Sequence, residues 1–403
     1  MGRPGVGEAV DGVSPAVVVR PGTVAEVEAA VRLAADGGLA LVASGLGQHL
    51  DVGGPPRRFD VLLRLDRLHD IVRHEAADMT VTALAGCPLS TLGRVLGACG
   101  QWLPLDPPDP EQTTVGGLVA ANLSGPLRAS QGTVRDLLLG IRVVGADGAV
   151  VMGGGRVVKN VAGYDLPKLH VGALGTLGIL IEATFKVRPR PEREEAVVIT
   201  CASARTAAEI AIVVRETIDP LWLELRGPGG VGEFGPLPVV VVGMGGNATE
   251  VADARSRVLA AVVGRQTTVV AEGAALRARL GHFPLEPAAA VLRAAVLPTV
   301  VGAVLDTIEH AAGSAVRYAA HATSGIVRIA VAGAEAVPVL LDVLRPVVET
   351  GGGALVVERA TPVVKVGLDV WGPPPGGMEL MRRVKDTFDP AGILAPGRFV
   401  GGL

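Results

Sequence analysis

The fold is decided by two glycine-rich stretches, TTVGGLVAAN at residues 113–122 and KNVAGYDLPKLHVGALGTLGIL at residues 159–180. Both place glycines where the backbone must approach another group closely, and both lead into apolar runs typical of a core helix or strand. Neither contains the GxGxxG fingerprint that opens a helix after a strand, nor the GxxxxGK(S/T) phosphate loop. They therefore predict a cofactor cradle assembled from several separated loops.

A third loop, SGLGQ at residues 44–48, follows a predicted buried strand at residues 39–43. Its successive backbone N–H groups would form a nest that binds an anion, although an ordinary turn between strands explains it equally well. In TTVGGLVAAN two glycines precede a helical stretch, so a diphosphate would lie against the helix start beside Thr113, Thr114 and Asn122. The alternative is a helix packed tightly through small residues. Together the loops indicate a flavin nucleotide held along its length.

The second stretch predicts a short helix followed by a tight approach to a buried strand. Asp165 is expected to cap this helix, which carries Leu166 and Leu169 into the core. Lys159 and Tyr164 are the reactive-looking side chains, but a solvated lysine and a hydrogen-bonded core tyrosine are the simpler interpretation. The stretch therefore contributes backbone shape rather than catalytic groups.

Composition excludes several classes of protein. The chain has 403 residues, which predicts two or three packed units, and its net charge of −3 leaves no basic surplus for binding nucleic acid. Hydrophobic residues make up 49% of it, enough for a sizeable core. The three cysteines, Cys87, Cys99 and Cys201, show no CxxC spacing and have no histidine-rich company. The sequence therefore predicts no zinc site, iron–sulfur cluster or other metal in this chain.

The sequence also predicts no direct insertion into a membrane. The longest uncharged apolar stretch, roughly residues 294–305, contains Pro298 and is shorter than the ~20 residues that a membrane span needs. The N-terminus carries Glu8 and Asp11 and lacks an apolar signal core. A cytoplasmic location is the expectation, which leaves attachment to a membrane through partner proteins open.

Strands and helices alternate in the first part of the chain, and strand–helix–strand units follow from about residue 196 to residue 357. The later order favours one or two ferredoxin-like α+β sheets with helices on one face. We expect three parts: a domain over residues 1–191, an α+β domain over residues 192–365, and a C-terminal segment over residues 366–403 that returns to the first domain.

These segments resemble the vanillyl-alcohol-oxidase-type (PCMH-type) FAD-binding family, and within it the FAD-binding E subunits of bacterial glycolate oxidase. The residues that carry the resemblance are QWLPLDPP (101–108), TTVGG, GPLRASQGTVRDLLLG (125–140), the 159–180 stretch and VRPRP (187–191), with DPAGILAPGR (389–398) as the closing motif. The implied fold is α+β: a two-part FAD-binding domain, a ferredoxin-like cap domain and a C-terminal return segment.

The resemblance implies which residues hold FAD. One backbone loop is formed by Ser44, Gly45, Leu46, Gly47 and Gln48, and the other by Thr113, Thr114, Gly116, Gly117 and Asn122. Gly125 follows the second loop past the cofactor, Gly178 and Ile179 meet the adenine end, and Arg398 lies near the flavin end. No residue matches a covalent flavin histidine, since His49 falls one position past the expected place, so non-covalent FAD is implied.

The implied function is oxidation of glycolate, a small 2-hydroxy acid, to glyoxylate, with electrons passed to an iron–sulfur partner. The implied partners are the catalytic FAD-binding D subunit of glycolate oxidase and its iron–sulfur subunit. The D subunits carry a metal-binding histidine signature, and nothing in this sequence matches it.

The sequence assigns no catalytic residue. His321, Arg317 and Arg328 are the candidates for a base and a carboxylate-binding arginine. A free-standing FAD-dependent dehydrogenase of another hydroxy acid or a sugar, and a non-catalytic FAD-binding relay subunit, stay open.

Overall fold

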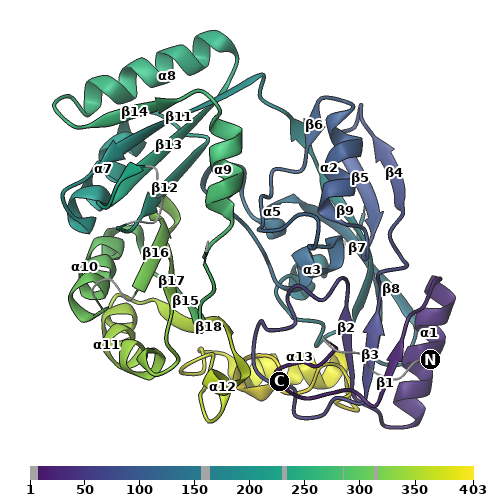
Figure 1. The fold of residues 1–403 in the computed structure, drawn as a ribbon. Helices are drawn as coiled ribbons and strands as arrows, with labels where there is room; N and C mark the ends of the chain where they lie inside the picture. Colours follow the sequence, from purple (N-terminus) through teal and green to yellow (C-terminus); the bar gives the residue numbers. More distant parts are fainter. Residues whose placement is uncertain (1–7, 156–163, 229–233, 285, 313–315) are drawn as a thin grey trace. The chain divides into compact units, whose positions relative to one another are not determined.

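The computed structural model describes residues 8–155, 164–228, 234–284, 286–312 and 316–403. The chain forms two compact units (Figure 1): the first contains residues 1–124, 133–190 and 373–403, and the second contains residues 125–132 and 191–372. The expected boundaries after residues 191 and 365 therefore fall after residues 190 and 372, and no pattern in the sequence indicates that residues 125–132 belong with the second unit. Within the described residues, no helix is long and apolar enough to cross a membrane.

The first unit begins with a small parallel sheet of order β1-β3-β2, made of β1 (Val17–Val19), β2 (Leu41–Ser44) and β3 (Val61–Arg64). Helix α1 (Val24–Asp36) crosses from β1 to β2 and starts at Thr23, whose side chain accepts a hydrogen bond from the Glu26 backbone N–H. Its buried face packs beside β2 and β3 in one apolar core. This sheet positions the SGLGQ loop, because the loop starts at the end of β2.

The larger sheet of the first unit is antiparallel, with the order β4-β5-β9-β7-β8. Its strands are β4 (Ile71–Glu75), β5 (Thr80–Leu84), β7 (Leu138–Val144), β8 (Val150–Gly154) and β9 (Ile179–Lys186), and the accompanying elements are α2 (Leu89–Gly97), β6 (Gln101–Trp102), α3 (Val115–Ala120), α5 (Val134–Leu137), α6 (Pro167–His170) and β10 (Arg188–Pro189). Strand β9 contributes to two apolar cores, since Ile181 packs with α1 and Phe185 packs with α2 and α3.

The expectations for the helix after residue 164 are wrong in three respects. Pro167 occupies the first turn of α6, so the helix starts later than predicted and has no side-chain cap. The Asp165 carboxylate instead accepts a hydrogen bond from Lys168, Leu169 is 42% exposed rather than in the core, and Tyr164 is 93% exposed rather than a core tyrosine. Lys159 lies outside the described residues.

The second unit contains one antiparallel eight-stranded sheet of order β14-β11-β13-β12-β16-β17-β15-β18. Its strands are β11 (Arg193–Thr200), β12 (Trp222–Arg226), β13 (Val239–Gly246), β14 (Thr267–Val270), β15 (Ala290–Ala295), β16 (Val316–His321), β17 (Ile326–Val331) and β18 (Ala354–Ala360). Each half has the strand order of a ferredoxin-like unit, and the halves join where β12 pairs with β16. The expected one or two ferredoxin-like sheets are thus two units fused edge to edge.

Helices cover one face of this sheet (Figure 1): α7 (Ala204–Thr217), α8 (Ala248–Ala261), α10 (Val301–Ala312) and α11 (Ala336–Thr350). Alternate strand residues such as Leu223 and Leu225 join these helices in the core. The residues between them, Glu224 and Arg226, are therefore on the other face. Two further helices are α4 (Arg128–Gln131), which contacts β12, and α9 (Gly273–Gly281), which contacts β11.

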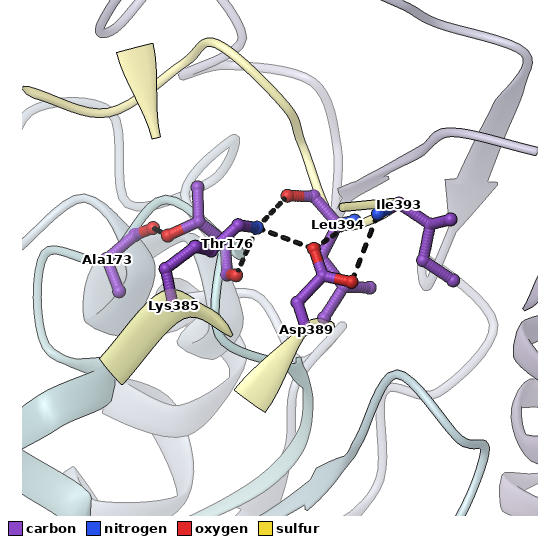
Figure 2. A network of polar contacts seen from close by, with 6 residues as sticks. All are labelled: Ala173, Thr176, Lys385, Asp389, Ile393 and Leu394. Carbon is purple, nitrogen blue, oxygen red and sulfur yellow. Dashed lines mark hydrogen bonds and ion pairs between the residues drawn. The ribbon is translucent and has the colours of Figure 1, made fainter. Parts of the chain in front are cut away.

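The second unit ends after α12 (Pro362–Lys365), and the C-terminal segment that follows carries α13 (Met378–Phe388) of the first unit. Leu394 bridges to Leu41 at the start of β2. Figure 2 shows the buried contact that fixes it: Lys385 Nζ donates to the carbonyl oxygens of Thr176 and Leu394, each at 2.8 Å, and to the Asp389 carboxylate at 2.6 Å. Asp389 in turn accepts hydrogen bonds from the backbone N–H groups of Ile393 and Leu394.

Candidate functional site

The first unit contains a pocket that encloses about 900 Å³ of empty space, part of it open to solvent. Most of its lining comes from four places: residues 42–50 at the end of β2, residues 112–121 around the start of α3, residues 170–180 before β9, and Arg398. Leu65 and Ala85 complete it. The pocket is therefore a cradle of separated loops, which is the arrangement that the glycine-rich stretches predict.

Glycines at two of these segments leave room for neighbouring groups that pack closely against the backbone. A Cβ atom on Gly45 would lie 2.3 Å from Thr114 Oγ1, and a Cβ atom on Gly116 would lie 3.0 Å from the Ala85 carbonyl oxygen. Gly47 has a φ of +92°, a left-handed conformation that favours glycine. Gly45 therefore lets the SGLGQ loop pack against the Thr114 side chain, and Gly116 lets the start of α3 pack against Ala85.

Helix α3 starts at this meeting point. Thr114 caps it, because its Oγ1 accepts a hydrogen bond from Gly117 N at 3.2 Å. The buried hydroxyl of Ser44, on the facing segment, has no hydrogen-bond partner among the described residues. A buried polar group of this kind requires a partner, and a bound polar ligand would supply one. The cradle fits a nucleotide cofactor such as FAD, whose phosphate oxygens would accept hydrogen bonds from exposed loop N–H groups.

The third lining segment, residues 170–180, begins with His170. The His170 ring packs edge-on against Phe388, with the ring centroids 6.0 Å apart. Burial lowers the pKa of His170 from 6.5 to about 4, so the ring is neutral at pH 7. Gly178, with a φ of +157°, places its backbone against this ring and against Val144. An uncharged, apolar wall of this kind suits a flat aromatic group rather than a phosphate.

Arg398 closes the pocket from the C-terminal segment. It is 2% exposed, and its Nη2 donates hydrogen bonds to the carbonyl oxygens of Leu50 at 2.9 Å and Val52 at 2.5 Å. Burial lowers the pKa of Arg398, while Asp11 and Asp51 raise it. The side chain therefore fixes the backbone that follows the SGLGQ loop.

The structure brings together most of the residues that the sequence assigns to FAD. The pocket is lined by Ser44, Gly45, Leu46, Gly47, Gln48, Thr114, Gly116, Gly117, Gly178 and Arg398. Thr113 does not line it, because its buried hydroxyl donates to the Pro108 carbonyl and contacts His49. Ile179 is a core residue of β9, and Asn122 lies one residue beyond the lining segment. Gly125 belongs to the second unit.

Sequence reasoning missed several lining residues, among them His49, Gln112, His170, Ala173 and Leu174. The glycines around Ala173 and Leu174 were a usable signal, since Leu174 itself has a φ of +53° between two left-handed glycines. His49 and His170 carry no such signal. Their places follow from the turns that precede them, which only the folded chain shows.

The three catalytic candidates lie in the second unit and do not form one cluster. His321 is 6% exposed and its Nδ1 contacts the Glu224 carboxylate. Arg328 pairs with Glu358 at 3.0 Å on the same face of the sheet. Arg317 is half-exposed and pairs with Glu286 at 2.6 Å. His321 and Arg328 therefore belong to a buried polar arrangement, whereas Arg317 forms a surface ion pair. Among the described residues, no group of three or more histidines, cysteines and acidic residues is placed to hold a metal ion.

Acid should destabilise the first unit through His170. Its folded pKa of about 4 lies below the ordinary 6.5, so between these values the unfolded chain binds a proton that the folded chain does not, and stability falls as the pH falls. From pH 7.5 to pH 5 this ring should cost about 2 kcal/mol. We expect His170→Asn to show a smaller loss of unfolding free energy over that range in urea titrations. Equal losses in the two proteins would contradict a buried neutral imidazole.

Comparisons with known proteins agree with this geometry. Residues 15–154 match the model of the FAD binding domain, and residues 373–399 match that of the C-terminal domain of FAD linked oxidases. Glycolate oxidase subunit GlcE of Escherichia coli is 47% identical over 122 residues, which is 30% of this chain and 35% of that protein. Glycolate oxidase subunit GlcD of Bacillus subtilis is 29% identical over 52% of this chain and 45% of that protein. The chain thus spans less than half the length of these two relatives.

Two further matches extend over nearly the whole chain. An uncharacterised FAD-linked oxidoreductase of Mycobacterium tuberculosis is 26% identical over 96% of this chain and 91% of that protein. A solved structure of alkyldihydroxyacetonephosphate synthase superposes with a TM-score of 0.71 at 18% identity, covering 95% of this chain and 76% of that one, which shows the fold alone. The expected α+β fold of the PCMH-type FAD-binding proteins is therefore confirmed. Residues 15–154 therefore carry an FAD binding domain, residues 373–399 match the C-terminal domain of FAD linked oxidases, and FAD is the cofactor.

Proposed function

We propose that this chain is the FAD-binding subunit of a glycolate oxidase-type complex that oxidises a small 2-hydroxy acid, glycolate, to glyoxylate. The observation that carries the proposal is the 47% identity to the glycolate oxidase subunit GlcE. Relatives named D-2-hydroxyglutarate dehydrogenase and probable D-lactate dehydrogenase, at 33% and 30% identity over about half the chain or less, support a hydroxy acid as the substrate class.

In this proposal the pocket of the first unit holds FAD without a covalent bond. The SGLGQ loop and the start of α3 would take the diphosphate, and the wall made by His170 and Gly178 would take a flat ring. Bound FAD supplies the acceptor for the hydride of the hydroxy acid. The chain's own contribution is to orient both molecules and to exclude water, as the buried Arg398 and the tight contact of Gly45 with Thr114 would do.

The partners of the proposed complex are a catalytic FAD-binding D subunit and an iron–sulfur subunit that takes the electrons. We place the complex in the cytoplasm, held at a membrane only through its partners. A free-standing FAD-dependent oxidoreductase is the second candidate, because the relative from Mycobacterium tuberculosis matches over 91% of its own length. The third candidate is a relay protein that binds FAD but performs no chemistry.

We expect glycolate to bleach the flavin absorbance of the complex under anaerobic conditions, because reduction of the isoalloxazine removes its visible absorption. The purified chain and the chain with its two partners are mixed with glycolate and followed near the flavin band. Bleaching of the isolated chain favours the free-standing enzyme and excludes a pure relay. Bleaching that requires the partners favours the complex. A chain that neither retains nor rebinds flavin contradicts the assignment of the pocket.

A further inference from the structure

The second unit buries a set of charged side chains on the sheet face opposite to α7, α8, α10 and α11. We call this set the charged face; it consists of Arg128 of α4, Glu224 and Arg226 of β12, Arg293 of β15, His321 of β16, Arg328 of β17 and Glu358 of β18. Glu224 and Arg226 are 1% and 2% exposed. Charges buried to this extent require partners of opposite charge.

Cations outnumber anions in the charged face. Glu358 is shared, because Arg328 contacts it through Nε at 3.0 Å and Nη2 at 3.2 Å while Arg293 lies 3.7 Å away. Glu224 is shared between Arg226 at 3.2 Å and His321. The set has four arginines and two carboxylates, so its formal charge is positive.

Two further observations concern the arginines at the centre of this positive charge. Arg226 donates through Nη2 to Glu224 and to the Leu280 carbonyl oxygen, but its buried Nε and Nη1 have no acceptor among the described residues. The pKa of Arg128 is lowered to about 10, chiefly by burial. The positive charges of Arg328 and Arg293 also lower this pKa, and the negative charges of Glu358 and Glu224 raise it by less. An anion bound beside these groups would relieve the repulsion that they share.

His321 adds a hydrogen-bond acceptor to this cationic surface. A carboxylate only accepts hydrogen bonds, so the contact with Glu224 fixes the proton of the neutral ring on Nδ1 and leaves the Nε2 lone pair available. Burial lowers the pKa of His321, with smaller contributions from Arg328 and Arg128, and outweighs the opposite effect of Glu224. The ring is therefore neutral at pH 7 and acts as an acceptor.

We propose that the charged face binds a 2-hydroxy acid, holding its carboxylate with arginine and accepting a hydrogen bond from its hydroxyl at His321 Nε2. Guanidinium groups match the planar two-oxygen carboxylate. The acceptor at His321 requires a donor on the ligand beside the anionic group, which a hydroxy acid has and a phosphate dianion lacks. Glu224 is a positioning residue, since it acts only through His321. The charged face would thus be the substrate-binding site of the proposed function, and oxidation of the bound acid rests on that function.

Titration calorimetry of the full FAD-loaded chain tests this site with trifluorolactate, a hydroxy acid whose trifluoromethyl group opposes hydride loss. Trifluoropropionate, which lacks the hydroxyl, and inorganic phosphate are the comparison ligands. We expect Arg328→Met to weaken trifluorolactate binding at least ~10-fold, since a charge-assisted pair is lost. Arg205→Met is the matched control, because Arg205 lies on α7 at the other face of the sheet and is 66% exposed.

Glu358→Gln is a second variant, which tests the same site even if Arg328→Met fails to fold. Glu358 competes with the ligand for Arg328, so its neutralisation should tighten trifluorolactate binding, which a damaged fold would not do. Binding that Arg328→Met leaves unchanged, or binding of trifluoropropionate or phosphate as tight as that of trifluorolactate, overturns the proposal. Trifluorolactate binding with no bleaching by glycolate would instead overturn the proposed function and leave this site standing.

Discussion

Gly45→Ala should lower the affinity of the chain for FAD roughly tenfold to a hundredfold, the effect of about 1–3 kcal/mol of overpacking. The added methyl group would lie 2.3 Å from Oγ1 and 2.7 Å from Cγ2 of Thr114. Thr114 caps α3 through the same Oγ1, so moving it breaks the hydrogen bond to Gly117 as well. Both walls of the pocket are displaced by one methyl group. Fluorescence titration of the apoprotein with FAD measures the change.

Gly93→Ala provides the matched control for this substitution. Gly93 lies in α2, is exposed, and has no atom within 4 Å of the position of an added Cβ. It should leave FAD affinity unchanged and raise the unfolding free energy by roughly 0.5–1 kcal/mol, because alanine is the better helix former. If Gly45→Ala binds FAD as tightly as Gly93→Ala does, the pocket lined by Gly45 is not the cofactor site.

Lys385→Met should lower the unfolding free energy of the first unit by about 3–5 kcal/mol, the usual cost of leaving a buried charge without its partner. The side chains of Lys385 and Asp389 are 9% and 0% exposed. Two carbonyl oxygens, of Thr176 and Leu394, lose their donor at the same time. Because Thr176 lies between the lining residues Gly175 and Gly178, FAD should also be lost at a lower denaturant concentration.

Lys168→Met is the control, since it removes an exposed lysine from an aspartate in the same unit. The Lys168 and Asp165 side chains are 35% and 53% exposed, so this pair should contribute less than about 1 kcal/mol. Chemical unfolding followed by flavin release compares the two variants. Similar midpoints for both would mean that the Lys385 contacts do not hold the segment in place. Lys385→Met with Asp389→Leu should recover only part of the loss, because Asp389 also accepts from Ile393 and Leu394.

The sequence predicts the elements of the first unit well where local signals are strong. Thr23 caps α1 through the Glu26 N–H as its spacing suggests, and the SGLGQ loop follows a buried strand. The prediction fails at residues 164–171, where Pro167 moves the helix start and leaves Leu169 and Tyr164 exposed. A capping aspartate and a proline compete for one short turn there, and the proline decides the outcome.

In the second unit the ferredoxin-like pattern is visible in the sequence, but the fusion into one sheet is not. The pairing of β12 with β16 joins residues 225 and 320, a separation that no local periodicity encodes. The sequence also does not predict which unit contains residues 125–132. They are adjacent in sequence to TTVGGLVAAN but fold with the second unit, so the extension of the cofactor loop through Gly125 could not be judged from sequence.

For the candidate site, the sequence predicts where the backbone needs glycine, but it does not predict the surroundings of the polar side chains. Glycines at Gly45, Gly47 and Gly116 mark places that need room or a left-handed conformation, and these conditions depend on local geometry. The environments of His170 and His321 depend on burial by distant residues, which sets their charge. Arg226 is the clearest example. Which of its N–H groups lack a hydrogen-bond acceptor depends on the residues that folding brings around it.

The pairing of Leu41 with Leu394 has a consequence for how the protein is made. The strand that carries the SGLGQ loop is synthesised early, yet its neighbour in the bridge emerges more than 350 residues later. At roughly 5–20 residues per second, that gap lasts on the order of 20–70 s. The second unit, whose strands are nearly continuous in sequence, can fold during this interval while the first waits with an open edge. We therefore expect FAD to bind only after the C-terminal segment, which contributes Arg398 to the pocket, has been synthesised.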